Sequence, residues 1–249
     1  MHRLLVSSDQ LASDTPLLPK EAANHLKVVR PKDGEEIELF DGRGRWRKFR
    51  VKVESRGFSL LASAPTESSP RPPWTLALFA CVTKGSRWDW TIEKATELGA
   101  TRIVPVVSAR TIVRINAGER AAKRERWTRI AEDAARQSDA KWIPEVCEPV
   151  AFAESLVLAR ETTCFAGALT TPPPQPIAVA VNSQLTTLNS KLSLYVGPEG
   201  DFTPDELAAL LEVATPVSFG STILRAETAA IYGLSVLKSA LSALAQVAI

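Results

Sequence analysis

Hydrophobic residues follow two different periods along the chain, and the change of period predicts two parts. Over roughly the first 70 residues, alternation predicts a small β-rich unit. Residues 36–40 alternate toward a hairpin turn at 41–44, and a short helix is predicted over 19–29. The returning strand places one set of side chains on the packed face, Phe49, Val51 and Val53, and a cationic set on the other, Lys48, Arg50 and Lys52.

Residues 65–73 contain four prolines and no periodic pattern, which is typical of a linker. We therefore predict a first domain with its linker at 1–73 and a second domain at 74–249. In the second, short apolar runs at 76–82, 102–107, 163–169, 192–196 and 216–219 are typical of buried parallel strands. Amphipathic helices are predicted at 88–98, 119–138 and 204–213, the last from the capping box Thr203-Pro204-Asp205-Glu206. The pattern predicts an α/β fold with a mostly parallel sheet.

The last segment, 228–249, is apolar nearly all round and has Lys238 as its only charged residue. A helix of this kind must be buried against more than one face of a sheet. Two interpretations stay open here: a homodimer interface, or the central helix of a monomer. Lys238 disfavours membrane insertion, and residues 1–10 lack the apolar run of a signal peptide, so we expect a soluble cytoplasmic protein without a membrane partner.

The charge is uneven although the 249 residues carry a net charge of only +2. Residues 41–56 contain seven basic and two acidic side chains, and residues 110–141 contain nine basic and five acidic ones. Residues 193–249, in contrast, contain two basic and six acidic side chains. A polyanionic partner is therefore expected to bind to the first two thirds of the chain. Three distant cysteines and two histidines exclude a disulfide framework and most zinc sites, so we expect a reducing compartment and no metal.

Two turns after predicted strands are candidates for a site. Gly197-Pro198-Glu199-Gly200 is neither a dinucleotide fingerprint nor a phosphate loop, and its carboxylates suit a cationic or zwitterionic ligand. The turn 219–228 carries Arg225 and Glu227, the only charged residues in a long apolar stretch. The alternatives are an ordinary strand-to-helix turn and a plain helix-start carboxylate. Two such turns in one domain favour a pocket between them.

Several of these segments carry a resemblance to a known family. They are Ala23-Asn24-His25-Leu26, Leu39-Phe40-Asp41-Gly42, Lys84-Gly85, 93–100 (EKATELGA), Arg136-Gln137-Ser138, Ile143-Pro144-Glu145, 197–200 (GPEG) and 223–229 (ILRAETA). In order and spacing the chain resembles the RsmE family, the bacterial small-subunit ribosomal RNA uridine N3-methyltransferases of the SPOUT superfamily. The likeness covers nearly the whole chain.

The resemblance implies a fold and a function beyond what the pattern shows. It implies an N-terminal PUA-like RNA-binding β-barrel, a C-terminal α/β domain with a trefoil knot, and a homodimer formed through that domain. It also implies transfer of a methyl group from S-adenosylmethionine to N3 of a uridine in 16S ribosomal RNA, free or in the assembled small subunit. Periodicity alone favours an unknotted sheet, because knots are rare.

The same resemblance implies roles for individual residues. Cofactor contacts are expected from three loops, at Leu169, Thr170, Gly197, Pro198, Glu199, Gly200, Phe219, Gly220, Ile223 and Leu224. Arg225 is expected to stabilise the uracil oxyanion and Glu227 to position it or accept the proton, with His25 as a competing acceptor. RNA contacts are expected from Asn24, His25, Arg30, Arg45, Arg47, Lys84 and Arg136. Trp46 either stacks on an unpaired base or packs in the barrel.

The chain departs from the family pattern at a few positions. Asp139 and Ala140 stand where glycine and arginine are usual, Asp201 replaces a second glycine after 197–200, and Thr222 stands where arginine is common. These departures motivate an alternative, a non-catalytic RNA-binding or ribosome-assembly protein on the same fold. A nucleotide-dependent oxidoreductase is disfavoured because no dinucleotide fingerprint follows any predicted strand.

Overall fold

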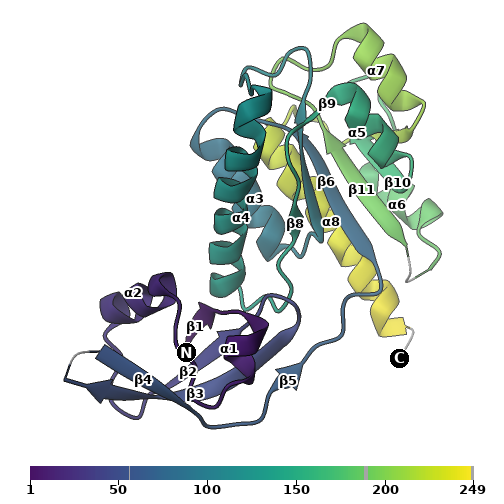
Figure 1. The fold of residues 1–249 in the computed structure, drawn as a ribbon. Helices are drawn as coiled ribbons and strands as arrows, with labels where there is room; N and C mark the ends of the chain where they lie inside the picture. Colours follow the sequence, from purple (N-terminus) through teal and green to yellow (C-terminus); the bar gives the residue numbers. More distant parts are fainter. Residues whose placement is uncertain (56, 188–189, 248–249) are drawn as a thin grey trace. The chain divides into compact units, whose positions relative to one another are not determined.

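The chain folds into two compact units, which we describe separately (Figure 1). The computed structural model describes residues 1–55, 57–187 and 190–247. The first unit comprises Met1–Arg71 and Ala135–Ile143, and the second comprises Pro72–Ala134 and Pro144–Ile249. The division between Arg71 and Pro72 falls inside the proline-rich segment. The assignment of 135–143 to the first unit is a tertiary feature with no signal in the hydrophobic pattern.

The first unit is a twisted sheet closed by two short helices. Its strands are β1 (His2–Leu5), β2 (Glu36–Phe40), β3 (Arg45–Glu54), β4 (Gly57–Ala62) and β5 (Glu67–Ser68). They run in the order β1-β2-β3-β4 with β5 on β3, and only the β1–β2 pair is parallel. The helices are α1 (Ser8–Ala12) and α2 (Lys20–Val29).

The predicted hairpin is confirmed, with Phe40 opposite Trp46 across the turn. Phe49 and Val51 are buried in the core of this unit, as expected, and Arg50 and Lys52 are exposed. The prediction is wrong at Val53, whose exposed fraction is 45%. Val53 lies near the end of β3, beyond the part of the strand that the core covers. The alternation of apolar and polar residues therefore continues at Val53, but its side chain is not buried.

Arg3 anchors the segment 135–143 in the first unit. Its guanidinium donates to Glu38 (Nε to Oε1, 2.7 Å) and to the carbonyl oxygens of Ala135 (2.8 Å) and Ala140 (3.3 Å). A cation at the end of a helix is favourable because the last carbonyl groups carry partial negative charge. The buried pair of Arg3 and Glu38 therefore fixes the carboxyl end of α4 (Arg120–Gln137).

The second unit is built on a parallel sheet, as the pattern predicts. Among the described residues its strands are β6 (Thr75–Cys81), β7 (Arg102–Val107), β8 (Glu145–Val146), β9 (Val150–Ala151), β10 (Thr163–Gly167), β11 (Lys191–Val196) and β12 (Ala214–Val217). The order is β12-β10-β11-β6-β7-β8, β9 pairs with β7, and every pair is parallel. The knot implied by the resemblance stays a prediction.

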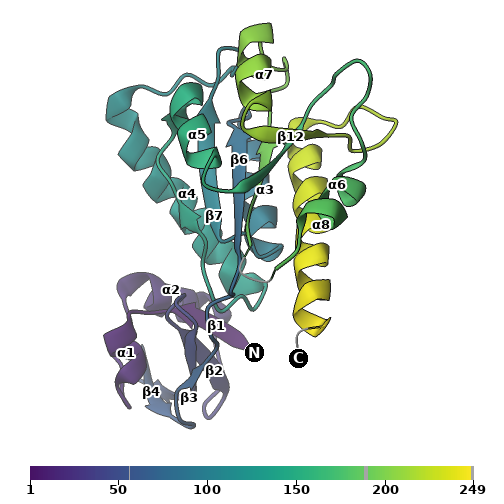
Figure 2. The ribbon, with the colours of Figure 1, turned by 90° about the vertical axis from the view of Figure 1, so that its right-hand side faces the viewer.

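Helices cover both faces of this sheet (Figures 1 and 2). Those not yet given are α3 (Ser86–Glu97), α5 (Phe152–Ala159), α6 (Ile177–Gln184), α7 (Pro204–Leu211), α8 (Ala226–Val247) and a 3-10 turn at Ala117–Glu119. The capping box before α7 is confirmed, since Thr203 Oγ1 accepts from the N–H of Glu206 at 3.2 Å. Neither α5 nor α6 was expected, because each is only eight residues long and lacks a clear polar face.

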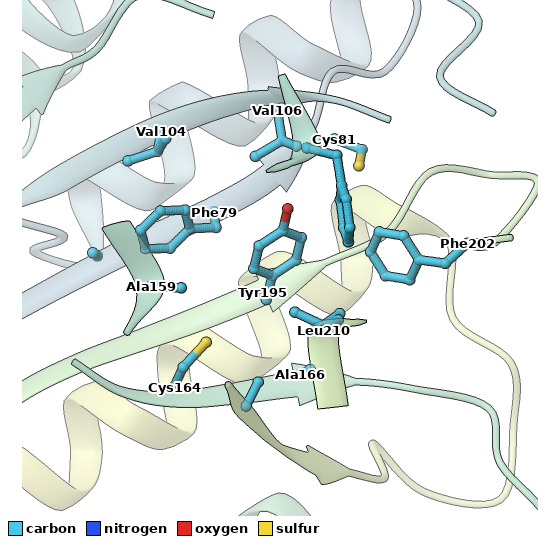
Figure 3. Packing of buried hydrophobic residues seen from close by; sticks show 13 residues of the cluster. Phe79, Cys81, Val104, Val106, Ala159, Cys164, Ala166, Tyr195, Phe202 and Leu210 are labelled. Atoms are coloured by element: carbon cyan, nitrogen blue, oxygen red, sulfur yellow. The ribbon is translucent and has the colours of Figure 1, made fainter. Parts of the chain in front are cut away.

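One face of the sheet packs against α5 and α7. Figure 3 shows the buried side chains of this core, among them Ala159 of α5 and Leu210 of α7. Tyr195 of β11 lies at the centre of this core, stacked on Phe79 with 5.7 Å between ring centroids. Its hydroxyl is 2.6 Å from Ser155 Oγ, which satisfies the one polar atom that the ring brings inside. This aromatic core fixes the end of β11, where the chain turns out of the sheet.

The other face packs against α8, which runs along β6 and β11 and also contacts α3 and α6 (Figure 2). Its inner side is buried at Ala230, Leu234, Leu237 and Leu241, while Tyr232 is 43% exposed. By length and composition Ala226–Gln246 is apolar enough to cross a membrane, and about a third of its most apolar window is buried within this unit. Helix α8 begins two residues before the predicted start, and the predicted end at 248–249 lies outside the described residues.

Candidate active site

A cavity of about 600 Å³ lies at the carboxyl ends of β10, β11 and β12. Its walls come from three segments: 167–174 at and after the end of β10, 196–201 at and after the end of β11, and 217–226 with Ala229, from the end of β12 into the start of α8. Glu227 is not among the lining residues. Ligands of open parallel sheets sit in crevices at this end of the strands. Small-molecule sites occupy about 300–1,000 Å³, so the volume is that of a cofactor-sized site.

The structure brings nearly all the predicted cofactor residues to this one cavity. Those that line it are Leu169, Thr170, Gly197, Pro198, Glu199, Phe219, Gly220, Ile223 and Leu224. Gly200 does not line it; its carbonyl oxygen faces Arg110, whose Nη1 donates to it at 2.9 Å. The two turns predicted to share a pocket therefore do so.

The turn 197–202 is held from outside by the loop that follows β7. Arg110 donates from Nη1 to the carbonyl oxygens of Gly200 (2.9 Å) and Phe202 (3.1 Å). The N–H of Ala109 donates to Glu206 Oε1 at 2.7 Å, at the start of α7. A guanidinium with fixed donor geometry can hold two carbonyl groups at once. Arg110 is a residue that sequence analysis missed, because 90 residues separate it from the turn.

Asp201 has a left-handed backbone, with φ +59°, and so does Asp139 in the first unit. Aspartate is one of the few residues other than glycine that adopt this conformation at a modest free-energy cost. At Asp201 the side chain also accepts from the N–H of Phe202 at 2.8 Å. At the two positions where the resemblance leads one to expect glycine, the aspartates thus adopt the backbone conformation that glycine favours.

Arg225 and Glu227 differ sharply in their surroundings. Arg225 is exposed, lines the cavity, and makes no side-chain hydrogen bond or ion pair within the described residues. Glu227, in the first turn of α8, is 9% exposed and its Oε2 has no hydrogen-bond partner there. Its Oε1 lies 4.0 Å from Nε of Arg87, whose Nη1 is 3.3 Å from Glu199 Oε1.

Sequence analysis also missed part of the cavity wall. Gly167 and Ala168, Pro173 and Pro174, and Ser218 line it, from the end of β10, the following loop and the end of β12. The four prolines of 172–176 were an available signal, because a proline-rich run directly after a strand marks a fixed loop. Arg87 offered no signal, since its two carboxylate partners are 112 and 140 residues away.

The residues predicted to contact RNA are spread over both units. In the first unit Asn24 and Arg30 are exposed, and His25 hydrogen-bonds Arg136 (Nη1 to Nδ1, 2.8 Å). Arg45 pairs with Asp41, and Arg47 donates to Asp14 and keeps only 14% of its side chain exposed. Lys84 is exposed in the second unit. Lys141 Nζ lies 4.4 Å from the ring centroid of Trp46, so one face of that indole is already covered.

Thiol and metal chemistry have little support in the described residues. All three cysteines are free; burial raises the pKa of Cys81 to about 12 and that of Cys164 to about 11, which keeps both protonated at neutral pH. Burial also raises the pKa of Cys147, against the hydrogen bond from Arg102. Within the ranges that the structure covers, no three His, Cys, Asp or Glu side chains are grouped to hold a metal ion.

Comparisons with known proteins agree with this architecture. Residues 70–238 match the family described as RNA methyltransferase domain, and residues 18–61 match the RNA methyltransferase PUA domain. The ribosomal RNA small subunit methyltransferase E of Synechocystis sp. is 32% identical over 92% of this chain and 74% of its own length. That of Bacillus subtilis is 30% identical over 86% of each chain.

A solved structure shows the same fold over almost the whole length. The ribosomal RNA small subunit methyltransferase E from Neisseria gonorrhoeae, in a crystal structure bound to S-adenosyl methionine, aligns with a TM-score of 0.82. It is 27% identical, and the match covers 96% of this chain and 97% of that one. By sequence, domain content and fold, this chain belongs to the ribosomal RNA small subunit methyltransferase E family of RNA methyltransferases.

Proposed function

We propose that this protein transfers the methyl group of S-adenosylmethionine to N3 of a uridine in 16S ribosomal RNA. The observation that carries the proposal is the cavity of about 600 Å³ into which both glycine turns and Arg225 converge. The names of the relatives, ribosomal RNA small subunit methyltransferase E, support the substrate class, and the bound ligand of the Neisseria structure supports the cofactor.

The cavity suits S-adenosylmethionine in its distribution of polar and apolar groups. Leu169 and Ile223 stand at its edge with 64% and 81% of their surface exposed, so an adenine ring that covered them would remove apolar area from water. Glu199 and Asp201 add carboxylates on the side of the β11 turn, where a cationic ligand is favoured. Backbone groups at Gly197 and Gly220 can approach the ligand closely, because neither residue has a Cβ.

When bound, S-adenosylmethionine supplies an electrophilic methyl group on a sulfonium centre. The residues of the chain must then manage charge on the uracil, because N3 is a nucleophile only after it loses its proton. Arg225 is exposed at the cavity and without an ion-pair partner among the described residues, which suits it to stabilise the developing uracil oxyanion. We assign Glu227, which directly follows the lining residue Ala226 in the first turn of α8, to accept the N3 proton.

His25 of the first unit remains the competing proton acceptor. Its ring already accepts a hydrogen bond from Arg136, which occupies an imidazole lone pair that a proton acceptor would need. This favours Glu227 over His25. The alternative of a non-catalytic RNA-binding protein is disfavoured, since the relatives are methyltransferases by name.

The proposal extends to the setting in which the enzyme acts. We assign a homodimer formed through the second unit, on the side of α8 where Tyr232 is exposed. Cytoplasmic localisation follows from a ribosomal RNA substrate. The proposal includes neither a membrane partner nor a metal ion.

The deciding experiment compares rRNA from cells with and without the gene. A methyl group at N3 blocks Watson–Crick pairing, so reverse transcription should stop at one uridine of 16S rRNA only where the enzyme is present. Purified protein and S-adenosylmethionine should restore the stop on RNA or small subunits from the deletion strain. Identical stop patterns in the two strains, with no restoration in vitro, would refute the assignment.

A further inference from the structure

The turn after β11 has two sides with different contacts. Residues 197–199 and Asp201 line the cavity, whereas Gly200 and Phe202 are not among the lining residues. The carbonyl oxygens of Gly200 and Phe202 instead accept hydrogen bonds from Nη1 of Arg110, at 2.9 Å and 3.1 Å. Arg110 is not a lining residue either, so it contacts the turn from outside the cavity.

Arg110 stands on a well-anchored segment that follows β7. Ser108 and Thr111 are buried, with 4% and 1% of their surface exposed. The N–H of Ser108 donates to Thr111 Oγ1 at 2.9 Å, and the N–H of Thr111 donates to the carbonyl oxygen of Ser108 at 3.2 Å. The N–H of Ala109 donates at 2.7 Å to Oε1 of Glu206, a residue of the α7 cap. Three hydrogen bonds therefore hold the backbone on both sides of Arg110.

A shift at the end of the turn that Arg110 holds would reach the cavity. The ring of Phe202 lies against the backbone of Gly197, where a Cβ atom would be 2.9 Å from Phe202 Cε2. Within the turn, the N–H of Asp201 donates to the carbonyl oxygen of Pro198 at 3.0 Å. Asp201 also has a left-handed backbone, with φ +59°, which costs free energy in any residue other than glycine. Movement of Phe202 would therefore alter the cavity wall at Gly197 and strain the turn further.

We propose that Arg110 is a positioning residue for cofactor binding: it holds the turn after β11 in the conformation that receives S-adenosylmethionine. The proposal rests on the function proposed above. Without the two hydrogen bonds, the turn would spend part of its time in conformations that do not bind, and the apparent Kd would rise as the competent fraction falls. Because these contacts join two surface segments, their loss should open the turn locally rather than unfold the protein. A group that organises the turn before binding acts on cofactor affinity and leaves the rate at saturating cofactor unchanged.

The test compares the wild type with Arg110→Met, which removes the donors but keeps an unbranched side chain. We expect the Kd for S-adenosylmethionine, measured by calorimetry without RNA, to rise about tenfold. The melting temperature should change by less than about 4 °C, and the single-turnover rate at saturating cofactor and RNA by less than about twofold. Hydrogen exchange of the Asp201 amide, which closes the turn onto Pro198, should be faster in the cofactor-free variant. Arg114→Met is the matched control, because Arg114 is exposed in the same loop and makes no hydrogen bond or ion pair among the described residues.

The failure of this role and the failure of the proposed function give different results. If the wild type does not bind S-adenosylmethionine, the proposed function and the positioning role fail together. If the wild type binds it and Arg110→Met has the same Kd, or exchanges the Asp201 amide no faster, only the positioning role is overturned. An equal rise in Kd for Arg114→Met, or a lower saturating rate with an unchanged Kd, would overturn that role as well. Should Arg110→Met unfold, Arg110→Gln, which is shorter and uncharged, gives the same comparisons.

Discussion

The ring of Phe219 lies over the backbone of Gly167 so closely that a Cβ atom at Gly167 would be 2.3 Å from Phe219 Cε2. Gly167 ends β10, and Phe219 stands in the loop between β12 and α8. The contact therefore joins two of the three loops of the cavity. Phe219 is braced from behind by Tyr232, with 5.7 Å between ring centroids. Its freedom to move away is limited for that reason.

Gly167→Ala should weaken cofactor binding. The added methyl group must displace Phe219 and its loop, and overpacking of this kind costs about 1–3 kcal/mol, which corresponds to roughly 5- to 150-fold in the Kd for S-adenosylmethionine. Calorimetric titration with S-adenosylmethionine measures this Kd. Gly118→Ala is the control, because a Cβ there meets nothing within 4 Å. Equal affinity in the Gly167 variant and the wild type would contradict the prediction.

Arg225→Ala should separate binding from catalysis. Arg225 lines the cavity and has no ion-pair partner among the described residues, so its removal leaves no unpaired charge behind. We expect cofactor affinity within about threefold of wild type and a loss of about 10²–10³ in methyl-transfer rate, as for other oxyanion-stabilising groups. Single-turnover kinetics and calorimetry give the two values. Arg160→Ala, on the exposed end of α5, should change neither, and full activity of Arg225→Ala would disprove the role.

Asp41 should make the first unit sensitive to acid. Its burial opposes ionisation, but the N–H groups of Arg43 and Arg45 and the side chains of Arg45 and Ser8 outweigh burial and hold the Asp41 pKa below 3.8. A carboxyl group with a lowered folded-state pKa stabilises the fold fully above its unfolded pKa, and this contribution is lost as pH falls through the folded pKa.

Asp41→Asn should therefore lower the free energy of unfolding by about 1–3 kcal/mol at pH 7. The difference from wild type should shrink as the pH falls below 3.8. Urea denaturation at several pH values measures both. Asp14→Asn, which removes an exposed carboxylate paired with the mostly buried Arg47, should lower the free energy of unfolding by less than about 1 kcal/mol. A pH-independent difference for Asp41→Asn would show that charge is not the cause.

Asp201 should tolerate glycine better than alanine. With φ at +59°, alanine meets the steric penalty of the left-handed region and loses the hydrogen bond to the N–H of Phe202, whereas glycine adopts this conformation freely. We expect Asp201→Ala to be less stable than Asp201→Gly by about 1 kcal/mol. Thermal denaturation of the two variants compares them directly. The reverse order would show that the turn relaxes out of the left-handed conformation.

The local sequence determined those helices, strands and turns that a cap, an apolar run or a glycine turn marks directly. The cap at Thr203 and Glu206 fixed the start of α7, and the apolar runs identified the parallel strands, because capping and burial on both faces of a sheet leave direct marks on composition. The turns 197–200 and 219–227 were recognisable for the same reason. They stand at the ends of strands that parallel pairing brings to one edge.

Only the tertiary structure decided which distant side chains meet there. Arg110 reaches the carbonyl oxygens of the turn after β11, and Arg87 reaches Glu199 and Glu227, across separations that no periodic pattern encodes. Alternation also failed at Val53, since burial depends on where the core ends rather than on the strand itself. A sequence states which residues can form a helix, a strand or a turn. Pairing between remote loops depends on strand order, and strand order is a property of the whole packed chain.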